Sequence, residues 1–503
     1  THTTCLSVCT TSTRSVWFAI TWSMSLYAPG ISSITPPSLR HSTPAVCATR
    51  STVAKRFELV ENDIVVGRGH DCDLHLDRDA VSRKHARLRR TDDKPLEIPY
   101  DELILALFLI PNLNRLPGLM AHASPIIVDS LLDDNGVGTT LREAIVEANS
   151  SPGADTIVFQ SGVSGTITLT GGQLAIDDDV TITGPGSGSL TVDANGASRA
   201  FLLYLYLGSF EVNISGLTIT GGAPPNNNGA GIYGHNVELS LDDVVLDDND
   251  AGTGYGGGIF IAGSSSTLAI TDSTISGNSA SYGGAVYVYE LANDSVFLIS
   301  DSVISDNSST THAGGFYMGV NGNYDVTIER SLLSGNTTNG DGSVGEFKVR
   351  AGTEMKIIDS TVSGNTADES GALYFAAVLG DVLIENTTVS GNASLTGGGV
   401  YVNSVAGDGS FTIAHSTITG NTSTNPGEGG EGGGGVYVGG GTVTLDHTVV
   451  AGNTSTLPGA DISAAGTGAF VGSYSMVGDL DGFTLGGTTN LPEGNPMLGA
   501  SCS

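Results

Sequence analysis

The stretch Ser273-Thr274-Ile275-Ser276-Gly277-Asn278 recurs in closely related form through the second half of a chain of 503 residues. Each copy ends in an asparagine, and the eight asparagines are Asn249, Asn278, Asn307, Asn336, Asn365, Asn392, Asn421 and Asn453. Successive asparagines are separated by 29, 29, 29, 29, 27, 29 and 32 residues. A repeat of nearly fixed length in this range predicts a solenoid, in which each repeat forms one coil that stacks on the next.

Apolar residues occupy three fixed positions in all eight repeats, namely ten, eight and three residues before the asparagine. In the repeat quoted above these are Leu268, Ile270 and Ile275. The two-residue step between the first two positions is the period of a β-strand. The sequence therefore predicts an all-β parallel β-helix of about three strands per coil, with like positions stacked about 4.8 Å apart. Glycine and asparagine are expected to adopt left-handed backbone angles at the corners.

A second strand follows each asparagine after a glycine pair, as in Gly283-Gly284-Ala285-Val286-Tyr287-Val288. A tyrosine recurs in the middle of this strand, at Tyr287, Tyr317, Tyr374, Tyr401 and Tyr437. Alternation with the flanking valines favours an outward orientation, in which Tyr287, Tyr317, Tyr401 and Tyr437 would form a stripe on which sugar rings stack. If the tyrosines point inward, they belong to the core.

Composition restricts the function. The net charge of −32 argues against a nucleic-acid partner, because phosphate binding needs a basic surface. The 71 glycines and the low content of charged residues, 14 %, are typical of a turn-rich β protein. No apolar run is long enough to span a bilayer, so we expect no transmembrane helix. None of the five cysteines lies in the repeats, which therefore carry neither a disulfide framework nor a Cys-x-x-Cys metal motif.

A polar column lies six residues before each asparagine, and its members are Asp243, Asp272, Asp301, Arg330, Asp359, Asn386, His415 and His447. The simplest interpretation is a solvated column next to the core. A second is a weak Ca²⁺ site at Asp243, Asp272 and Asp301, because stacked carboxylates repel unless a cation bridges them. A third is a lyase-like centre with Arg330 as the base between Asp301 and Asp359. The 32-residue gap argues against His415 and His447 as a metal pair.

A capping box, Thr140-Leu141-Arg142-Glu143, predicts a helix that covers the open end of the solenoid. The surrounding sequence, from Thr139 through Ile145 and on to Pro152–Ile157, resembles the "CSLREA" entry motif of secreted bacterial right-handed β-helix proteins. Thr139 and Thr140 replace the Cys and Ser of that motif. The resemblance covers residues 125–499 and implies the pectate-lyase-like superfamily and an extracellular or cell-surface location. The repeated phrases also resemble those of polymorphic outer-membrane adhesins.

The segment 55–90 is of a different kind. Gly67-Arg68-Gly69, Cys72–Leu76 and Val81–Ala86 resemble the first half of a forkhead-associated (FHA) domain, a β-sandwich that binds phosphothreonine peptides. The resemblance implies that Arg68, Ser82 and Arg83 contact the phosphate, a role that guanidinium and hydroxyl groups suit. The later Asn-Gly loop of that family is missing here.

The remaining N-terminal sequence carries weaker signals. We expect residues 1–54 to be disordered, because they are rich in Thr and Ser and have no sustained periodicity. Residues 91–124 form a linker whose apolar run Leu103–Ile110 and Ala121-His122-Ala123 resemble a secretion signal. A buried helix is the alternative for this run.

These features favour a secreted or cell-surface β-helix protein that acts as a non-catalytic adhesin or glycan-binding module, with a polysaccharide or a cell-surface ligand as partner. The first alternative is a Ca²⁺-dependent polysaccharide lyase or a glycoside hydrolase, since this fold serves both roles. The second is phosphothreonine-peptide binding by the FHA-like segment. No cofactor is expected, except for Ca²⁺ under the first alternative.

Overall fold

The computed structural model describes residues 124–133, 138–151, 153–206, 208–225, 228–289, 295–318, 324–425, 432–480, 485 and 487, and the backbone of six strands in the first 90 residues. The chain forms two compact units, residues 1–116 and 117–503. None of the described residues belongs to a helix long and apolar enough to cross a membrane.

The N-terminal unit contains two small sheets. Strands β1 (Thr3–Thr11), β2 (Ser15–Ser23) and β3 (Thr52–Glu58) form an antiparallel sheet in that order, so the segment expected to be disordered contains two strands. In the second sheet, β4 (Asp63–Gly67) pairs parallel to β5 (Leu74–His75) and antiparallel to β6 (Ala86–Arg89). The signal-like run at 103–110 lies outside the described residues.

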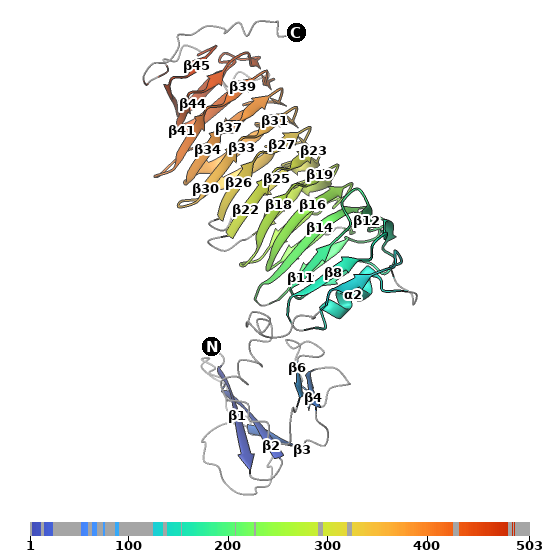
Figure 1. Ribbon diagram of the computed structural model, residues 1–503. Coiled ribbons are helices and arrows are strands. Elements are labelled where there is room, and N and C mark those ends of the chain that lie inside the picture. The colour runs from blue at the N-terminus through green and yellow to red at the C-terminus, as the bar shows by residue number, and fades with distance from the viewer. Residues whose placement is uncertain are drawn as a thin grey trace. The chain divides into compact units, whose positions relative to one another are not determined.

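The second unit is a right-handed parallel β-helix (Figure 1). One coil consists of β18 (Thr267–Thr271), β19 (Thr274–Ser276), β20 (Ser279–Tyr282) and β21 (Val286–Tyr289), so there are four short strands where about three were expected. Each strand pairs in parallel with its counterpart 25 to 36 residues later, and Leu268 lies opposite Phe297. Four rows of strands therefore run along the solenoid.

The strands of these rows have the following bounds. The first row is β14 (Phe210–Thr220), β16 (Val237–Asp247), β18, β22 (Ser295–Ser300), β26 (Tyr324–Glu329), β30 (Glu354–Ile358), β34 (Asp381–Glu385), β38 (Ser410–Ala414) and the later parts of β41 (Val436–Asp446) and β44 (Ile462–Ser473). The second is the end of β14 and β16, then β19, β23 (Val303–Ser305), β27 (Leu332–Ser334), β31 (Thr361–Ser363), β35 (Thr388–Ser390), β39 (Thr417–Thr419), β42 (Val449–Val450) and β45 (Met476–Val477). The third is β20, β24 (Ser308–His312), β28 (Thr337–Thr338), β32 (Thr366–Ala367), β36 (Ala393–Ser394), β40 (Thr422–Ser423) and β43 (Thr454–Ser455). The fourth is β13 (Phe201–Tyr204), β15 (Ile232–His235), β17 (Ile259–Ala262), β21, β25 (Phe316–Met318), β29 (Gly345–Val349), β33 (Leu373–Val378), β37 (Val400–Val402) and the first parts of β41 and β44.

The N-terminal end is covered as the capping box predicts. Helix α2 (Leu141–Ala148) starts at Thr140, whose side chain accepts a hydrogen bond from the Glu143 backbone N–H. Its buried face packs against β7 (Ile126–Val128), β8 (Asp155–Phe159) and β10 (Leu174–Ile176). The first coils are completed by β9 (Gly165–Thr168), β11 (Val180–Thr183) and β12 (Leu190–Asp193). The helix thus covers apolar side chains that would otherwise meet water at this end.

The eight asparagines form a continuous ladder inside the solenoid, and seven of them are fully buried. Asn278 Nδ2 donates to Asn307 Oδ1 (2.9 Å), and the Asn278 backbone N–H donates to the same oxygen (3.1 Å). The same pair of contacts recurs along the ladder. At the C-terminal end of the ladder the side-chain amide of Asn453 donates to Asp461 Oδ1 (2.9 Å). A carboxylate therefore accepts the hydrogen bond that a further asparagine would otherwise accept. The ladder satisfies the corner backbone groups as expected.

The expected backbone angles of the corners need correction. The eight ladder asparagines are not left-handed; instead the residue just before them is, as at Gly277 (φ 65°) and Asp306 (φ 57°). The polar column is also left-handed throughout, with φ between 47° and 53° from Asp243 to His447. Aspartate and asparagine tolerate this conformation better than most residues because their short side chains bond locally. The residue types found in the polar column are therefore partly explained by the left-handed backbone conformation at these positions.

A buried carboxyl group near the N-terminal end makes stability depend on pH. Burial, with the nearby carboxylates of Asp179, Asp177 and Asp155, raises the pKa of Asp178 to about 7. Because the folded-state pKa lies above the unfolded value, the stabilisation that this group contributes is complete below about pH 4 and is lost as the pH rises through 7. We expect Asp178→Asn to increase the free energy of unfolding by about 2 kcal/mol at pH 8, allowing for its partial exposure, and to leave it nearly unchanged at pH 4.

Urea denaturation at both pH values measures this difference, with the exposed Asp408→Asn as the control. An equal effect of Asp178→Asn at pH 4 and pH 8 would contradict the assignment.

Candidate functional site

The tyrosine column lies on the outer side of the fourth row, while its neighbours Val286 and Val288 belong to the interior core. The rings stack on one another: Phe260, Tyr287 and Tyr317 have centroids 5.4 and 5.0 Å apart and planes 5° from parallel. Tyr401 and Tyr437 are 4.7 Å apart, and both are buried. Neighbouring rings cover both faces of Tyr287 but only one face of Tyr317, where Lys348 Nζ lies 5.7 Å from the ring centroid. Sugar stacking on these tyrosines stays a prediction.

One coil interrupts this column. Its segment Asp341-Gly-Ser-Val-Gly-Glu-Phe-Lys348 has Glu346 in register with Tyr317 on one side and Tyr374 on the other. Gly345 lies where the neighbouring coils have Phe316 and Leu373. The sequence analysis did not single out this coil, although its departure from the Gly-Gly-x-Val-Tyr-Val pattern could have identified it as unusual.

Two features of β29 and its neighbour β33 accompany the change. The ring of Phe347 fills the core space beneath Gly345, so that a Cβ atom on Gly345 would lie only 2.2 Å from it. In the neighbouring strand β33 an extra residue, Ala376, is accommodated, because Phe347 pairs with Phe375 and Lys348 pairs with Ala377. Such a bulge re-aims the side chains that follow it and is common next to functional sites.

Four titratable side chains meet at the interruption, and we call His312, Asp341, Glu346 and Lys348 the Glu346 cluster. Glu346 Oε1 lies 3.2 Å from Lys348 Nζ, and Glu346 Oε2 lies 3.3 Å from His312 Nδ1. Asp341 Oδ2 lies 3.7 Å from the same histidine nitrogen. The Glu346 side chain is only 8 % exposed, whereas His312 and Lys348 are 29 % and 28 % exposed. The Glu346 carboxylate is therefore mostly buried, whereas the two basic side chains that contact it are partly exposed to solvent.

The surroundings shift the pKa values of several groups in and next to the cluster. Burial raises the pKa of Asp341, although Ser370 and His312 oppose the shift. Burial, with the charge of Glu346, raises the pKa of Tyr317 to about 12, and burial also raises that of Tyr374. The two phenols remain protonated hydrogen-bond donors at neutral pH. The cluster therefore combines acceptors, donors and a carboxyl group that holds its proton more strongly than usual, an arrangement that suits hydroxyl-rich ligands.

The polar column does not form a comparable site. Arg330 donates to Asp301 Oδ1 (2.8 Å) and Oδ2 (2.7 Å) and also pairs with Glu329 (2.8 Å). Its hydrogen bonds to Asp301 raise the pKa of Arg330 further above its usual range, which is unfavourable for a base. Asp359 instead accepts from Asn386 Nδ2, so the two carboxylates that Arg330 contacts are those of Asp301 and Glu329, not those of Asp301 and Asp359. This raised pKa is unfavourable for the lyase interpretation centred on Arg330, which stays a prediction.

The three aspartates considered for Ca²⁺ have different partners. Asp243 accepts from Ser187 Oγ (2.7 Å), and Asp301 is bound by Arg330. Within the described part of the chain, no group of three or more His, Cys, Asp or Glu side chains is arranged to hold a metal ion. Calcium binding at Asp243, Asp272 and Asp301 stays a prediction.

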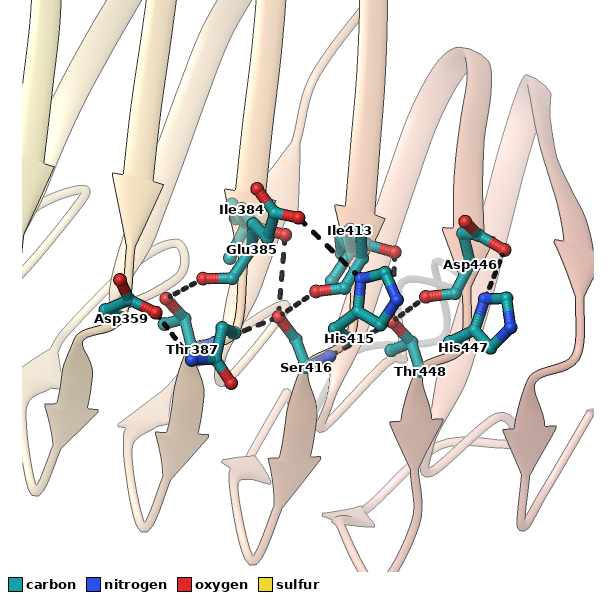
Figure 2. Close-up of polar contacts among 12 residues, drawn as sticks. Asp359, Ile384, Glu385, Thr387, Ile413, His415, Ser416, Asp446, His447 and Thr448 are labelled. Carbon is teal, nitrogen blue, oxygen red and sulfur yellow. Dashed lines mark hydrogen bonds and ion pairs between the residues drawn. The ribbon is translucent and has the colours of Figure 1, made fainter.

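The histidines of the column are closer than the sequence suggested. His415 and His447 lie in adjacent coils with ring centroids 5.0 Å apart and planes 11° from parallel (Figure 2). The extra residues of the 32-residue repeat lie between β40 and β41, so Ile413 and Leu445 remain in register. The argument from spacing against a close pair is therefore wrong.

Comparisons with known proteins agree with this division of the chain. Residues 257–455 match the family of right-handed β-helix regions, and residues 64–113 match the FHA domain family. Arg68, Ser82 and Arg83 fall within the second match but outside the described residues, so phosphopeptide binding stays a prediction. No curated protein matches the sequence. Among solved structures, the A-module of the Azotobacter vinelandii mannuronan C-5 epimerase AlgE6 is 12 % identical, covering 67 % of this chain and 94 % of that one with a TM-score of 0.28. A likeness at this level establishes no shared activity.

Proposed function

We propose that the β-helix is a secreted or cell-surface protein that binds a neutral polysaccharide at the Glu346 cluster. The observation that carries the proposal is the replacement of one ring in the aromatic column by a buried carboxylate flanked by His312 and Lys348. Carboxylates and phenols are suited to hydrogen-bond sugar hydroxyls, and such bonds to a charged group contribute about 1.5–3 kcal/mol each. The extracellular location rests on the resemblance of residues 139–157 to the entry motif.

Charge supports a neutral rather than an acidic glycan. The chain has a net charge of −32, and the cluster contains two carboxyl groups against one lysine and one histidine. A polyuronate would carry a negative charge on every sugar, and the summed field of the protein would repel it. A neutral chain meets no such barrier.

Retention of the full-length protein on insoluble neutral and acidic polysaccharides tests the proposal. We expect retention on a neutral polymer, and we expect Glu346→Gln to weaken it about tenfold because a charged acceptor becomes a neutral one. The control is Glu354→Gln, the same change at a side chain that is 54 % exposed and pairs with Lys356. Equal retention of both variants, or a preference for polyuronates, would contradict the proposal.

A second candidate function is cleavage of the bound glycan. It is favoured by the position of Asp341, whose pKa burial raises, on the same histidine nitrogen as Glu346. Glycoside hydrolysis needs one carboxyl group that keeps its proton and one that is ionised. New reducing ends that appear with the wild-type protein and disappear in Asp341→Asn would establish hydrolysis. Retention without new reducing ends would leave the protein a binding module.

A further inference from the structure

We propose that His415 and His447 form a binding site for a divalent transition-metal ion, separate from the Glu346 cluster. The two side chains project from the left-handed corner between the first and second rows, in adjacent coils (Figure 2). Their stacked rings, 5.0 Å apart, belong to an exposed series that continues to Tyr474, 4.7 Å beyond His447. Exposed rings of like orientation on one edge present their nitrogen atoms to the same region of solvent.

Each histidine faces a carboxylate through Nδ1. His447 Nδ1 lies 2.9 Å from Asp446 Oδ1, and His415 Nδ1 lies 3.7 Å from Glu385 Oε1. Asp446 is itself held in place by Ser473 Oγ, which donates to it (2.7 Å). The hydrogen bond between His447 Nδ1 and Asp446 favours the His447 tautomer with its hydrogen on Nδ1 and leaves the Nε2 lone pair free. Metal-binding histidines commonly have such a carboxylate partner, which orients the ring and makes the nitrogen more basic.

The backbone beneath the pair is fixed. Both residues have φ near 47°, and each is followed by a buried hydroxyl residue, Ser416 or Thr448. The Ser416 backbone N–H donates to Thr448 Oγ1 (3.4 Å), and Thr448 Oγ1 donates to Ile413 O (3.0 Å). These bonds belong to a ladder of hydroxyl groups that runs along the corner of successive coils. The spacing of the histidines is therefore set by the fold before any ion binds.

The geometry also indicates the class of ion. Metal–nitrogen distances near 2.0–2.1 Å require the two Nε2 atoms to approach more closely than the ring spacing. Side-chain exposures of 54 % and 48 % leave the rings room to tilt toward a shared ion. With two imidazole ligands and water in the remaining positions, the site suits Cu²⁺, Ni²⁺ or Zn²⁺, whereas Ca²⁺ and Mg²⁺ prefer oxygen ligands.

The test uses the full chain after alkylation of its five cysteines, titrated with Zn²⁺ by calorimetry and with one equivalent of Cu²⁺ for electron paramagnetic resonance. The variants are His415→Asn and His447→Asn, because Asn386 already occupies this column at φ 47° and the substitution fits the fold. We expect either variant to weaken the site at least tenfold and to remove one nitrogen from the Cu²⁺ signal.

The matched control is His235→Asn, which changes a histidine that stacks on Tyr204 (4.9 Å) and has no stacked histidine partner among the described residues. Ca²⁺ should not compete at the site. Unchanged Zn²⁺ affinity and stoichiometry in both column variants, or an equal loss in His235→Asn, would overturn the proposal.

Discussion

Replacing Asn336 with alanine is expected to lower the free energy of unfolding by about 4 kcal/mol. Asn336 Oδ1 accepts from the Asn307 backbone N–H (3.2 Å) and from Asn307 Nδ2 (3.0 Å), and Asn336 Nδ2 donates to Ile304 O (2.9 Å) and to Asn365 Oδ1 (3.0 Å). Alanine removes the acceptor and the donor together. The Asn307 backbone N–H then lies buried without its partner, and each such group costs about 1–3 kcal/mol.

The position in the middle of the ladder adds a second consequence. Because each coil of a solenoid contacts only its neighbours, a weak coil lets the two halves unfold separately. Urea denaturation followed by circular dichroism should therefore become broader, and hydrogen exchange should accelerate first near Asn336. The control is Asn339→Ala, an exposed asparagine in the same coil, for which a change within about 0.5 kcal/mol is expected. Similar effects of the two substitutions would show that the ladder does not stabilise the solenoid.

Much of the fold was accessible from the sequence because its signals repeat in every coil. The positions of Leu268, Ile270 and Ile275 predicted core residues, and all three are buried. The capping box at Thr140 predicted the covering helix. The angles at the corners were harder, because asparagine serves both as a left-handed residue and as a buried amide ligand. In the ladder the asparagines act as buried amides, and the residue before each of them adopts the left-handed conformation.

The candidate site could not be derived from a single repeat. His312 and Glu346 are distant in sequence and come from different rows, and the extra residue in β33 places Ala377 rather than Ala376 beside Lys348. Comparison of the coils would have revealed the departure at Asp341–Lys348, but not which groups surround it. The polar column appeared more promising in the sequence because it is regular. Its regularity follows partly from the left-handed turn, and its charges lie mostly exposed, as for Asp301 and Arg330.

Restoring the repeat pattern at the site should harm the protein rather than help it. Neighbouring coils have Phe316 and Leu373 at the position of Gly345, so Gly345→Val resembles a substitution that would usually stabilise. Here the Phe347 ring already occupies that part of the core, and the added Cβ would lie 2.2 Å from it. Overpacking of this kind costs about 1–3 kcal/mol, and we expect the upper end because Phe347 is fully buried.

A second substitution separates crowding from other causes. In Gly345→Val/Phe347→Val, the strand regains the alternation of Val286-Tyr287-Val288, in which both valines face the core. The double variant should recover about 2 kcal/mol relative to Gly345→Val, a coupling typical of residues in direct contact. Its glycan retention should nevertheless fall, because removal of the Phe347 ring takes away the packing that positions Glu346 and Lys348. Additive losses of stability in the two single variants and the double variant would contradict this account, since crowding by Phe347 predicts compensation.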